Sequence, residues 1–171
     1  VRGARSASRT APHLVAAFDH VHGVVLGQQA VDVKSNEIPA VRDLLAGFQP
    51  SDLAGCVITV DAMHTQDDTA RIICAAGADY VFTVKANRAN LLKALKLLPW
   101  AAVPIGSTNS EHGHGRQVRR TIKVLAIPGL PGWPQFTGAS QVAQLRRTVT
   151  RAGNKSVEVV YLITSADHTS A

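Results

Sequence analysis

Acidic side chains are missing from most of the second half of this chain. No Asp or Glu lies between His112 and Lys155, whereas residues 1–100 carry ten basic and nine acidic residues. The basic residues of the acid-free stretch are Arg116, Arg119, Arg120, Lys123, Arg146, Arg147, Arg151 and Lys155. A field of one sign attracts polyanions such as nucleic acids, although a solvated basic surface without a ligand has the same composition.

Paired cysteines, long apolar runs and a leader-like N-terminus are also missing. Cys56 and Cys74 do not form a CxxC pair, which excludes a zinc site built on cysteine. Both lie in apolar patterns, so we expect two small buried thiols in a reducing, cytoplasmic compartment. No apolar run approaches the length that crosses a membrane, and no apolar core follows the N-terminal arginines. We therefore expect neither a membrane span nor a secretory signal.

The 171 residues suffice for one domain with a sizeable core, and the chain begins with the pattern of a β-hairpin and a helix. Residues 13–18 and 23–31 are apolar strand patterns, and the short link between them is typical of antiparallel pairing. Apolar residues recur at helical spacing over 38–48, with Ser35 or Asn36 as the expected cap.

Strands and helices then alternate through the middle of the chain. Residues 56–60 and 80–84 are short apolar strands, and helical patterns cover 66–76 and 91–98. Gly77 is expected to close the first of these helices with a left-handed cap. The alternation implies crossover connections and parallel pairing of the two strands.

The pattern changes after residue 100. Residues 101–110 have the composition of a linker, and residues 117–127 alternate as a half-buried strand. We expect Arg119, Thr121 and Lys123 on its outer, basic face. The remaining stretches are a loop over 128–138, a strand or a helix over 141–150, and a last strand over 157–163.

Asp61 stands where the strand of residues 56–60 stops and a polar segment begins. A carboxylate at that point lies at the mouth of an α/β sheet, where such folds place their chemistry. The structural alternative is that Asp61 caps the next helix. Residues 65–68, however, have the Thr-x-x-acid form of a capping box, which would start that helix too late for Asp61 to cap it. The pattern therefore predicts a carboxylate available for chemistry.

Several short motifs follow one another in a specific order over nearly the whole chain. They are Arg2-Gly3-Ala4-Arg5, His13-Leu14-Val15-Ala16-Ala17-Phe18, Lys34-Ser35-Asn36-Glu37-Ile38-Pro39, Val60-Asp61-Ala62-Met63-His64-Thr65-Gln66, Asp79-Tyr80-Val81-Phe82-Thr83-Val84-Lys85-Ala86-Asn87 and His112-Gly113-His114-Gly115-Arg116. In this succession the chain resembles the DDE transposases of the ISAs insertion-sequence family. The resemblance implies an α/β fold with an RNase H-like mixed sheet and flanking helices. We expect it to be incomplete at both ends, with a basic β-rich segment after residue 110.

The resemblance also implies metal-dependent cleavage and transfer of DNA strands. Such enzymes use two Asp and one Glu to hold two divalent ions, Mg²⁺ or Mn²⁺, about 3.5–4 Å apart around the reacting phosphate. Asp61 matches the second acid of that trio, as a catalytic residue and metal ligand. The family's first Asp precedes the motif matched at Arg2, and its last Glu follows the strand matched at 161–165. We therefore expect one ligand of three, and a truncated remnant that is catalytically incompetent.

The remaining site assignments concern DNA. Lys85 follows the strand beside that of Asp61, so we expect it to contact phosphate at the same mouth. The further backbone contacts are assigned to Arg116, Arg119, Arg120 and Lys123. The partners implied are insertion-sequence ends and a second subunit, either a copy of this chain or a full-length transposase, with no membrane partner.

Other acids have structural interpretations beside functional ones. Glu37 suits the first turn of a helix, where the dipole favours an acid, but it also follows a strand and can approach the site. Asp19 and Asp32 are expected in turns, and Asp67 and Asp68 in helix capping.

Two histidine-containing features stay open. His64 either contacts substrate or stabilises charge near Asp61, or it simply enters the helix. The Glu111–His114 stretch contains metal-ligand side chains, but its glycines make it flexible and it lacks helical spacing, which disfavours metal ligation. Val118 stands where many members of the resembled family have an acid, which weakens any catalytic role for an acid near that strand.

We predict one partial RNase H-like domain over residues 1–171, with an α/β core at 1–100 and a basic β-rich segment with the last strand at 111–163. The alternative is a non-catalytic DNA-binding or interfering module that uses the basic 112–155 segment. An unrelated α/β enzyme with Asp61 as nucleophile would need an early acidic cluster, and residues 1–18 contain no Asp or Glu.

Overall fold

A β-hairpin opens the computed structural model, which describes residues 13–31, 37–129 and 131–167. Strands β1 (His13–Asp19) and β2 (Val24–Val31) pair antiparallel as a separate two-stranded sheet, as the sequence predicts. Asp19 closes the turn because its Oδ1 accepts hydrogen bonds from the backbone N–H groups of Val21 and His22, at 2.8 and 3.2 Å. The turn role predicted for Asp19 is thereby confirmed.

Helix α1 (Glu37–Ala46) packs on this hairpin, and the short helix α2 (Pro50–Leu53) follows it. The packing is close at Gly27 of β2. A Cβ there would lie 3.2 Å from side-chain atoms of both Leu44 and Phe48, so glycine lets the helix approach the strand. The predicted cap at Ser35 or Asn36, and the turn residue Asp32, lie outside the described residues.

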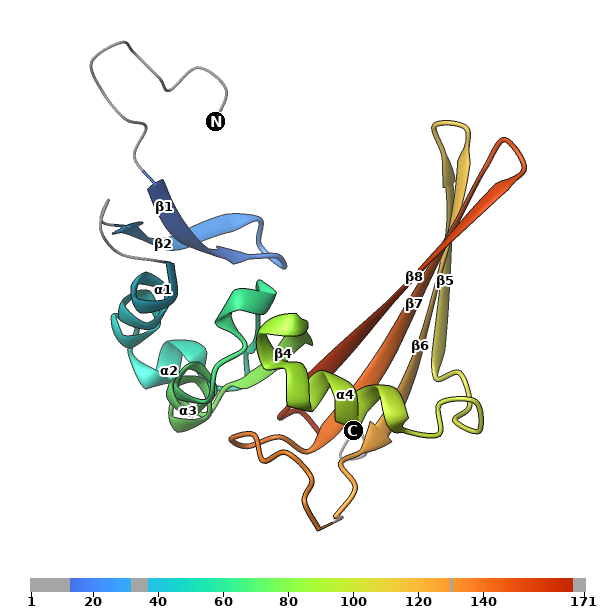
Figure 1. Ribbon diagram of the computed structural model, residues 1–171. Helices are drawn as coiled ribbons and strands as arrows, with labels where there is room; N and C mark the ends of the chain where they lie inside the picture. Colours follow the sequence, from blue (N-terminus) through green and yellow to red (C-terminus); the bar gives the residue numbers. More distant parts are fainter. Residues whose placement is uncertain (1–12, 32–36, 130, 168–171) are drawn as a thin grey trace.

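The second sheet is mixed and has six strands in the order β3-β4-β8-β7-β6-β5 (Figure 1). Its members are β3 (Val57–Val60), β4 (Asp79–Val84), β5 (Ser107–Gly113), β6 (Arg116–Ala126), β7 (Gln141–Arg151) and β8 (Asn154–Thr164). Strands β3 and β4 are parallel, as predicted, and every other pair is antiparallel. We call β5 to β8 the arm, because their hairpin tips extend away from the helices (Figure 1).

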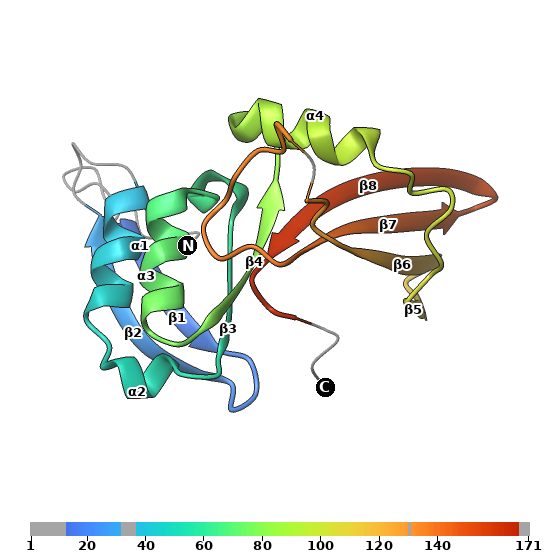
Figure 2. The ribbon, with the colours of Figure 1, turned by 90° about the horizontal axis from the view of Figure 1, so that it is seen from below.

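Helix α3 (Asp67–Ala75) makes the crossover from β3 to β4, and α4 (Ala89–Leu97) follows β4. Gly77 ends the α3 turn at φ +71°, as the sequence predicts. Seen from below, α4 lies beside the base of the arm while α1 and α3 lie near the hairpin (Figure 2). This α/β architecture, a mixed sheet with flanking helices, confirms the predicted class and is compatible with an RNase H-like core.

The core gathers around β4. Tyr80 and Phe82 are fully buried and stacked, with ring centroids 4.4 Å apart, and Ile73 of α3 and Ile163 of β8 are equally inaccessible. Full burial of such a side chain contributes about 1.5–3 kcal/mol. The Tyr80 hydroxyl donates a 2.7 Å hydrogen bond to the carbonyl of Thr137, and burial raises the pKa of Tyr80 above its usual range. The core therefore fixes the two parallel strands whose ends form the candidate site.

Two local expectations need correction, and one open choice is resolved. The predicted linker over 101–110 is wrong in its second half, because Ser107 starts β5 and pairs with Ile122 of β6. The open choice over 141–150 resolves to a strand, β7. Cys56 is exposed rather than buried and Cys74 is half-buried, since Cys56 precedes β3 at the free edge of the sheet.

Among the described residues, no helix is both long and apolar enough to span a membrane.

Candidate functional site

Asp61 follows the last residue of β3 and is exposed. It occupies the position before the 3₁₀ turn η1 (Ala62–His64), yet its side chain makes no capping hydrogen bond. Its carboxylate also forms no hydrogen bond or ion pair with any described residue, although its backbone carbonyl accepts a 2.9 Å hydrogen bond from the His64 N–H. A carboxylate that stabilises nothing around it is free for a ligand.

The turns after β3 and β4 are tied together beside Asp61. Thr65 Oγ1 donates a 2.7 Å hydrogen bond to the carbonyl of Thr83, near the end of β4. Asn87, in the 3₁₀ turn η2 (Ala86–Arg88), donates through Nδ2 to the carbonyl of Ala62 at 2.7 Å. Lys85 lies between β4 and η2 and is exposed. Asp61 and Lys85 thus lie at the C-terminal ends of two adjacent parallel strands, as predicted.

The predicted capping box at residues 65–68 is wrong. Gln66 is the residue before α3, its side chain makes no cap, and Thr65 is fully buried with its hydroxyl committed to β4. Asp67 accepts from Arg88 at 2.7 Å and from the Thr137 backbone N–H at 3.2 Å. Tertiary contacts therefore use the side chains that the local pattern assigned to the helix end.

Asp68 is likewise paired rather than capping. It accepts from Arg71 one turn along α3 at 2.9 Å and lies 3.3 Å from Arg42 of α1. Both contacts are partly exposed, so each is worth at most about 1 kcal/mol. The acids of the first turn thus help to fix α3 against its neighbours.

Glu37 and His64 form a contact that local patterns did not reveal. One carboxylate oxygen of Glu37 lies 2.6 Å from His13 Nε2 of β1, and the other lies 3.7 Å from His64 Nε2. His64 is only 3% exposed. Substrate contact by His64 is therefore not supported, and Glu37 instead connects the hairpin to the turn that follows Asp61.

The carboxylate oxygens of Asp61, at the C-terminal end of β3, fit one ligand position of a hard divalent ion. Such ions take carboxylates and water, and Mg²⁺ is often held by one or two carboxylates together with substrate phosphates. Within residues 13–31, 37–129 and 131–167, however, no three His, Cys, Asp or Glu side chains group closely enough to hold a metal. The described residues therefore fit a partial site and do not form a complete two-metal site.

The Glu111–His114 stretch likewise belongs to no group of three metal-ligand side chains among the described residues. Glu111 pairs with Arg120 at 2.6 Å, and His114 adopts φ +50° in the turn between β5 and β6. Glu111 and His112 thus belong to strand β5, and only His114 of this stretch lies in the turn.

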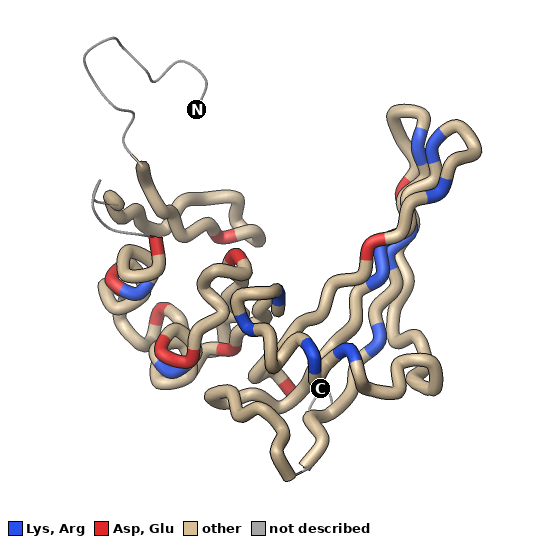
Figure 3. Tube along the Cα trace, in the orientation of Figure 1, with Lys and Arg blue, Asp and Glu red and all other residues tan. Residues whose placement is uncertain are grey.

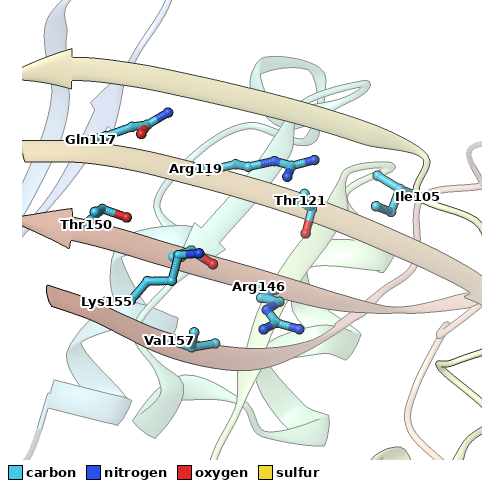
Figure 4. Close-up of a pocket in the computed structure, with 9 residues that line it drawn as sticks. Ile105, Gln117, Arg119, Thr121, Arg146, Thr150, Lys155 and Val157 are labelled. Carbon is cyan, nitrogen blue, oxygen red and sulfur yellow. The ribbon is translucent and has the colours of Figure 1, made fainter. Parts of the chain in front are cut away.

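The basic residues lie on two distinct faces of the arm. Directly opposed residues of antiparallel strands point to the same face. Gln117, Thr150 and Lys155 therefore share one face, as do Arg119 with Thr148 and Thr121 with Arg146. That face holds a groove of about 430 Å³ (Figure 4), lined by Ile105, Gln117, Arg119, Thr121, Arg146, Thr148, Thr150, Lys155 and Val157. We call it the groove face.

The predicted DNA contacts are divided between these faces. Arg119 lies on the groove face and is exposed. Lys123 lies on the same face nearer its base, where Nζ donates a 2.5 Å hydrogen bond to the carbonyl of Trp100. Arg116 and Arg120 lie on the opposite face, with Arg120 paired to Glu111. The structure thus does not bring all four residues together.

Two basic residues of the groove were not among the DNA contacts predicted from the sequence. Arg146 and Lys155 are distant from Arg119 in sequence and join it only through the β6–β7–β8 register. The acid-free run from 112 to 155 was the signal that included them. Figure 3 shows that acidic residues lie mainly on the helical part and that basic residues run along the arm.

Comparison with known proteins gives a consistent result over most of the chain. The family described as "Transposase DDE domain" matches residues 2–165. The chain is 34% identical to the Escherichia coli "Putative protein YbfL" and 34% identical to the "H repeat-associated putative transposase YhhI", in each case over 97% of this chain and 46% of the relative. It is 36% identical to the "H repeat-associated putative transposase YbfD" over 72% of this chain and 50% of that protein.

The chain spans about half the length of these curated relatives. No solved structure matches it.

Proposed function

We propose a function from one premise, which is that the chain belongs to the family of the transposase DDE domain. In that role the protein takes part in transposition of an insertion sequence, by metal-dependent cleavage and transfer of DNA strands. Assignment to the ISAs group within the family rests on the succession of motifs. The proposal concerns the part of a transposase that this chain supplies.

The observation that carries the proposal is the state of Asp61. Its carboxylate is exposed at the C-terminal end of a parallel strand and has no hydrogen bond or ion pair among the described residues. Open α/β sheets place ligands outside that end of their strands. We assign Asp61 as a ligand of Mg²⁺ or Mn²⁺.

Asp61 would hold a divalent ion, whose chemistry there would be to polarise a phosphate oxygen and lower the pKa of a bound water. Lys85 supplies a positive charge at the same edge, which orients the phosphate of the DNA. Thr65 and Asn87 hold the turns around Asp61 through their 2.7 Å hydrogen bonds to the carbonyls of Thr83 and Ala62. These residues bind and position, and the remaining ligands would come from outside the described residues.

We further propose that the described residues alone do not cleave DNA, since they hold no group of three metal-ligand side chains. Incubation of the chain with element-end duplex and Mg²⁺ or Mn²⁺ should leave both strands intact. Strand cleavage that disappears in Asp61→Asn would contradict this statement while supporting the metal role of Asp61.

Manganese binding tests the role of Asp61 directly. The electron paramagnetic resonance signal of free Mn²⁺ should fall when chain and duplex DNA are added together. Asp61→Asn should weaken Mn²⁺ binding by about tenfold or more, since even residues that only support metal ligands cost 10–100-fold. Asp43→Asn is a matched control, because Asp43 is an exposed carboxylate on α1. Equal Mn²⁺ affinity in wild type and Asp61→Asn would refute the assignment.

A second candidate function is a non-catalytic DNA-binding or interfering module, acting as a homo-oligomer or with a full-length transposase. The observation that favours it is the groove face, whose residues do not include Asp61 or its neighbours. If this is the function, adding the chain to a full-length family transposase should reduce strand transfer, and the Asp61→Asn chain should inhibit equally well. Loss of inhibition in Asp61→Asn would count against it.

A further inference from the structure

We infer that the groove face of the arm is a docking surface for the phosphate backbone of duplex DNA, with Arg119, Arg146 and Lys155 as its ionic contacts. The inference rests on the proposed function and deepens it, because it assigns one face of the arm and one form of DNA. The contacts expected from the sequence on the arm were near neighbours on one strand and lie on both faces of the arm. The three residues named here share one face.

The three cations are spread along the groove face. Strand register places Lys155 in a row with Gln117 and Thr150, Arg119 in a row with Thr148 and Val157, and Arg146 in a row with Thr121 and Val159. Successive rows are two residues apart, or about 7 Å. One cation in each of three rows suits a repeating polyanion better than a single phosphate, for which the cations would converge on one point. Figure 4 shows these side chains along the groove.

Within the described part of the chain, no acid pairs with these cations. Glu111 and Glu158 belong to the opposite face, because they pair in register with Val118 and Arg147. Neither Arg119, Arg146 nor Lys155 forms an ion pair with a described residue. Their charges are therefore available to a ligand.

The opposite face is electrostatically weaker although it also carries arginines. Arg120 pairs with Glu111 at 2.6 Å, and Arg147 lies 3.7 Å from Glu158. Each acid offsets part of the positive field on that side. The groove face is thus the stronger attractor for a polyanion.

Neutral donors complete the lining. Gln117, Thr121, Thr148 and Thr150 lie among the cations. Threonine hydroxyls and glutamine amides are common donors to phosphate oxygens, and such contacts carry no base information. The surface should therefore bind DNA without strong sequence preference.

The absence of an aromatic residue from the groove lining favours duplex over single-stranded DNA. Single-strand sites use aromatic rings on which bases stack. Tyr161 lies on the groove face, but its ring packs against Trp100, with centroids 6.0 Å apart. The lining offers threonine, glutamine and aliphatic side chains instead. These suit a backbone whose bases are already stacked and paired.

The test is duplex binding by the whole chain as a function of salt, measured by fluorescence anisotropy. The groove variant is Arg146→Gln with Lys155→Gln, and the control is Arg147→Gln with Arg151→Gln. Both remove two charges from the β7–β8 hairpin, but from opposite faces. Each phosphate contact contributes about 0.9 to the slope of log affinity against log salt, so the groove variant should lose roughly 1.8 and the control nearly nothing. Arg119→Gln alone should lose about 0.9.

Each remaining outcome has a defined meaning. Wild-type slope and affinity in the groove variant, or a larger loss in the control, overturn the groove assignment and leave the proposed function standing. Tighter binding of a single strand than of the duplex overturns the duplex assignment. Absence of all DNA binding by the wild type at low salt overturns both the inference and the DNA role. Thermal melting of each variant is the control for folding, and we expect the fold to be retained because the substituted side chains are at least partly exposed.

Discussion

Replacing Thr65 by valine should destabilise the protein by about 1–3 kcal/mol. The hydroxyl is fully buried and donates a 2.7 Å hydrogen bond to the Thr83 carbonyl. Valine keeps the volume but removes the donor, and leaving the partly buried Thr83 carbonyl without this partner costs about that amount. For a chain of this size each kcal/mol corresponds to roughly 2–4 °C in Tm. Urea denaturation should show a lower midpoint with an unchanged slope.

Two further variants show which bond is responsible. Thr59→Val changes an exposed threonine on β3 and should stay within about 0.5 kcal/mol of wild type. Thr65→Asp distinguishes a capping role of Thr65 from its hydrogen bond to β4. Aspartate is a good helix cap, but its carboxylate cannot donate to the Thr83 carbonyl. We expect Thr65→Asp to be less stable than Thr65→Val. Wild-type stability in Thr65→Asp would restore the capping interpretation and refute the tertiary bond.

Three smaller predictions follow from the same contacts. Gly138→Ala should destabilise by about 1–3 kcal/mol in urea, because φ is +69° and the new Cβ would lie 2.7 Å from Cys74 Sγ; Cys74→Ala should recover part of the loss. Cys56 should react with a thiol reagent faster than Cys74, since Cys56 is exposed and burial raises the pKa of the Cys74 thiol; Cys56→Ala should remove the fast phase. The hydrogen bonds from the His22 side chain and from the backbone lower the pKa of Asp19, so its stabilising effect is present above the unfolded-state pKa and disappears as pH falls through the folded-state pKa. Carboxyl NMR should show that His22→Gln raises the pKa of Asp19.

Short-range patterns in the sequence predicted several elements of the fold correctly. The β1–β2 hairpin, the α3 crossover and the Gly77 helix end depend on short-range alternation, helical spacing and a positive φ. The α/β class and parallel β3–β4 pairing followed from their order. The position of Asp61 at the end of β3 followed from the change of polarity there, whereas its lack of a capping role was inferred from a capping box at residues 65–68 that the structure does not contain.

Non-local contacts account for what the sequence did not predict. Thr65 has the form of a cap, but a carbonyl of β4 takes its hydroxyl. Ser107 has linker composition, but β6 supplies a strand partner. Arg146 reaches the row beside that of Arg119 only because β6 and β7 pair in one register. A polar strand is specified by its partner more than by its own pattern.

The most direct test of the account is the place where a paramagnetic divalent ion binds in the presence of duplex DNA. In backbone amide NMR, Mn²⁺ should broaden the signals of Asp61, of η1 and of Lys85 before any others, and Asp61→Asn should abolish that pattern while Asp43→Asn keeps it. Broadening that centres elsewhere in the chain, or that persists in Asp61→Asn, would contradict the assignment of Asp61 as the metal ligand that this chain contributes.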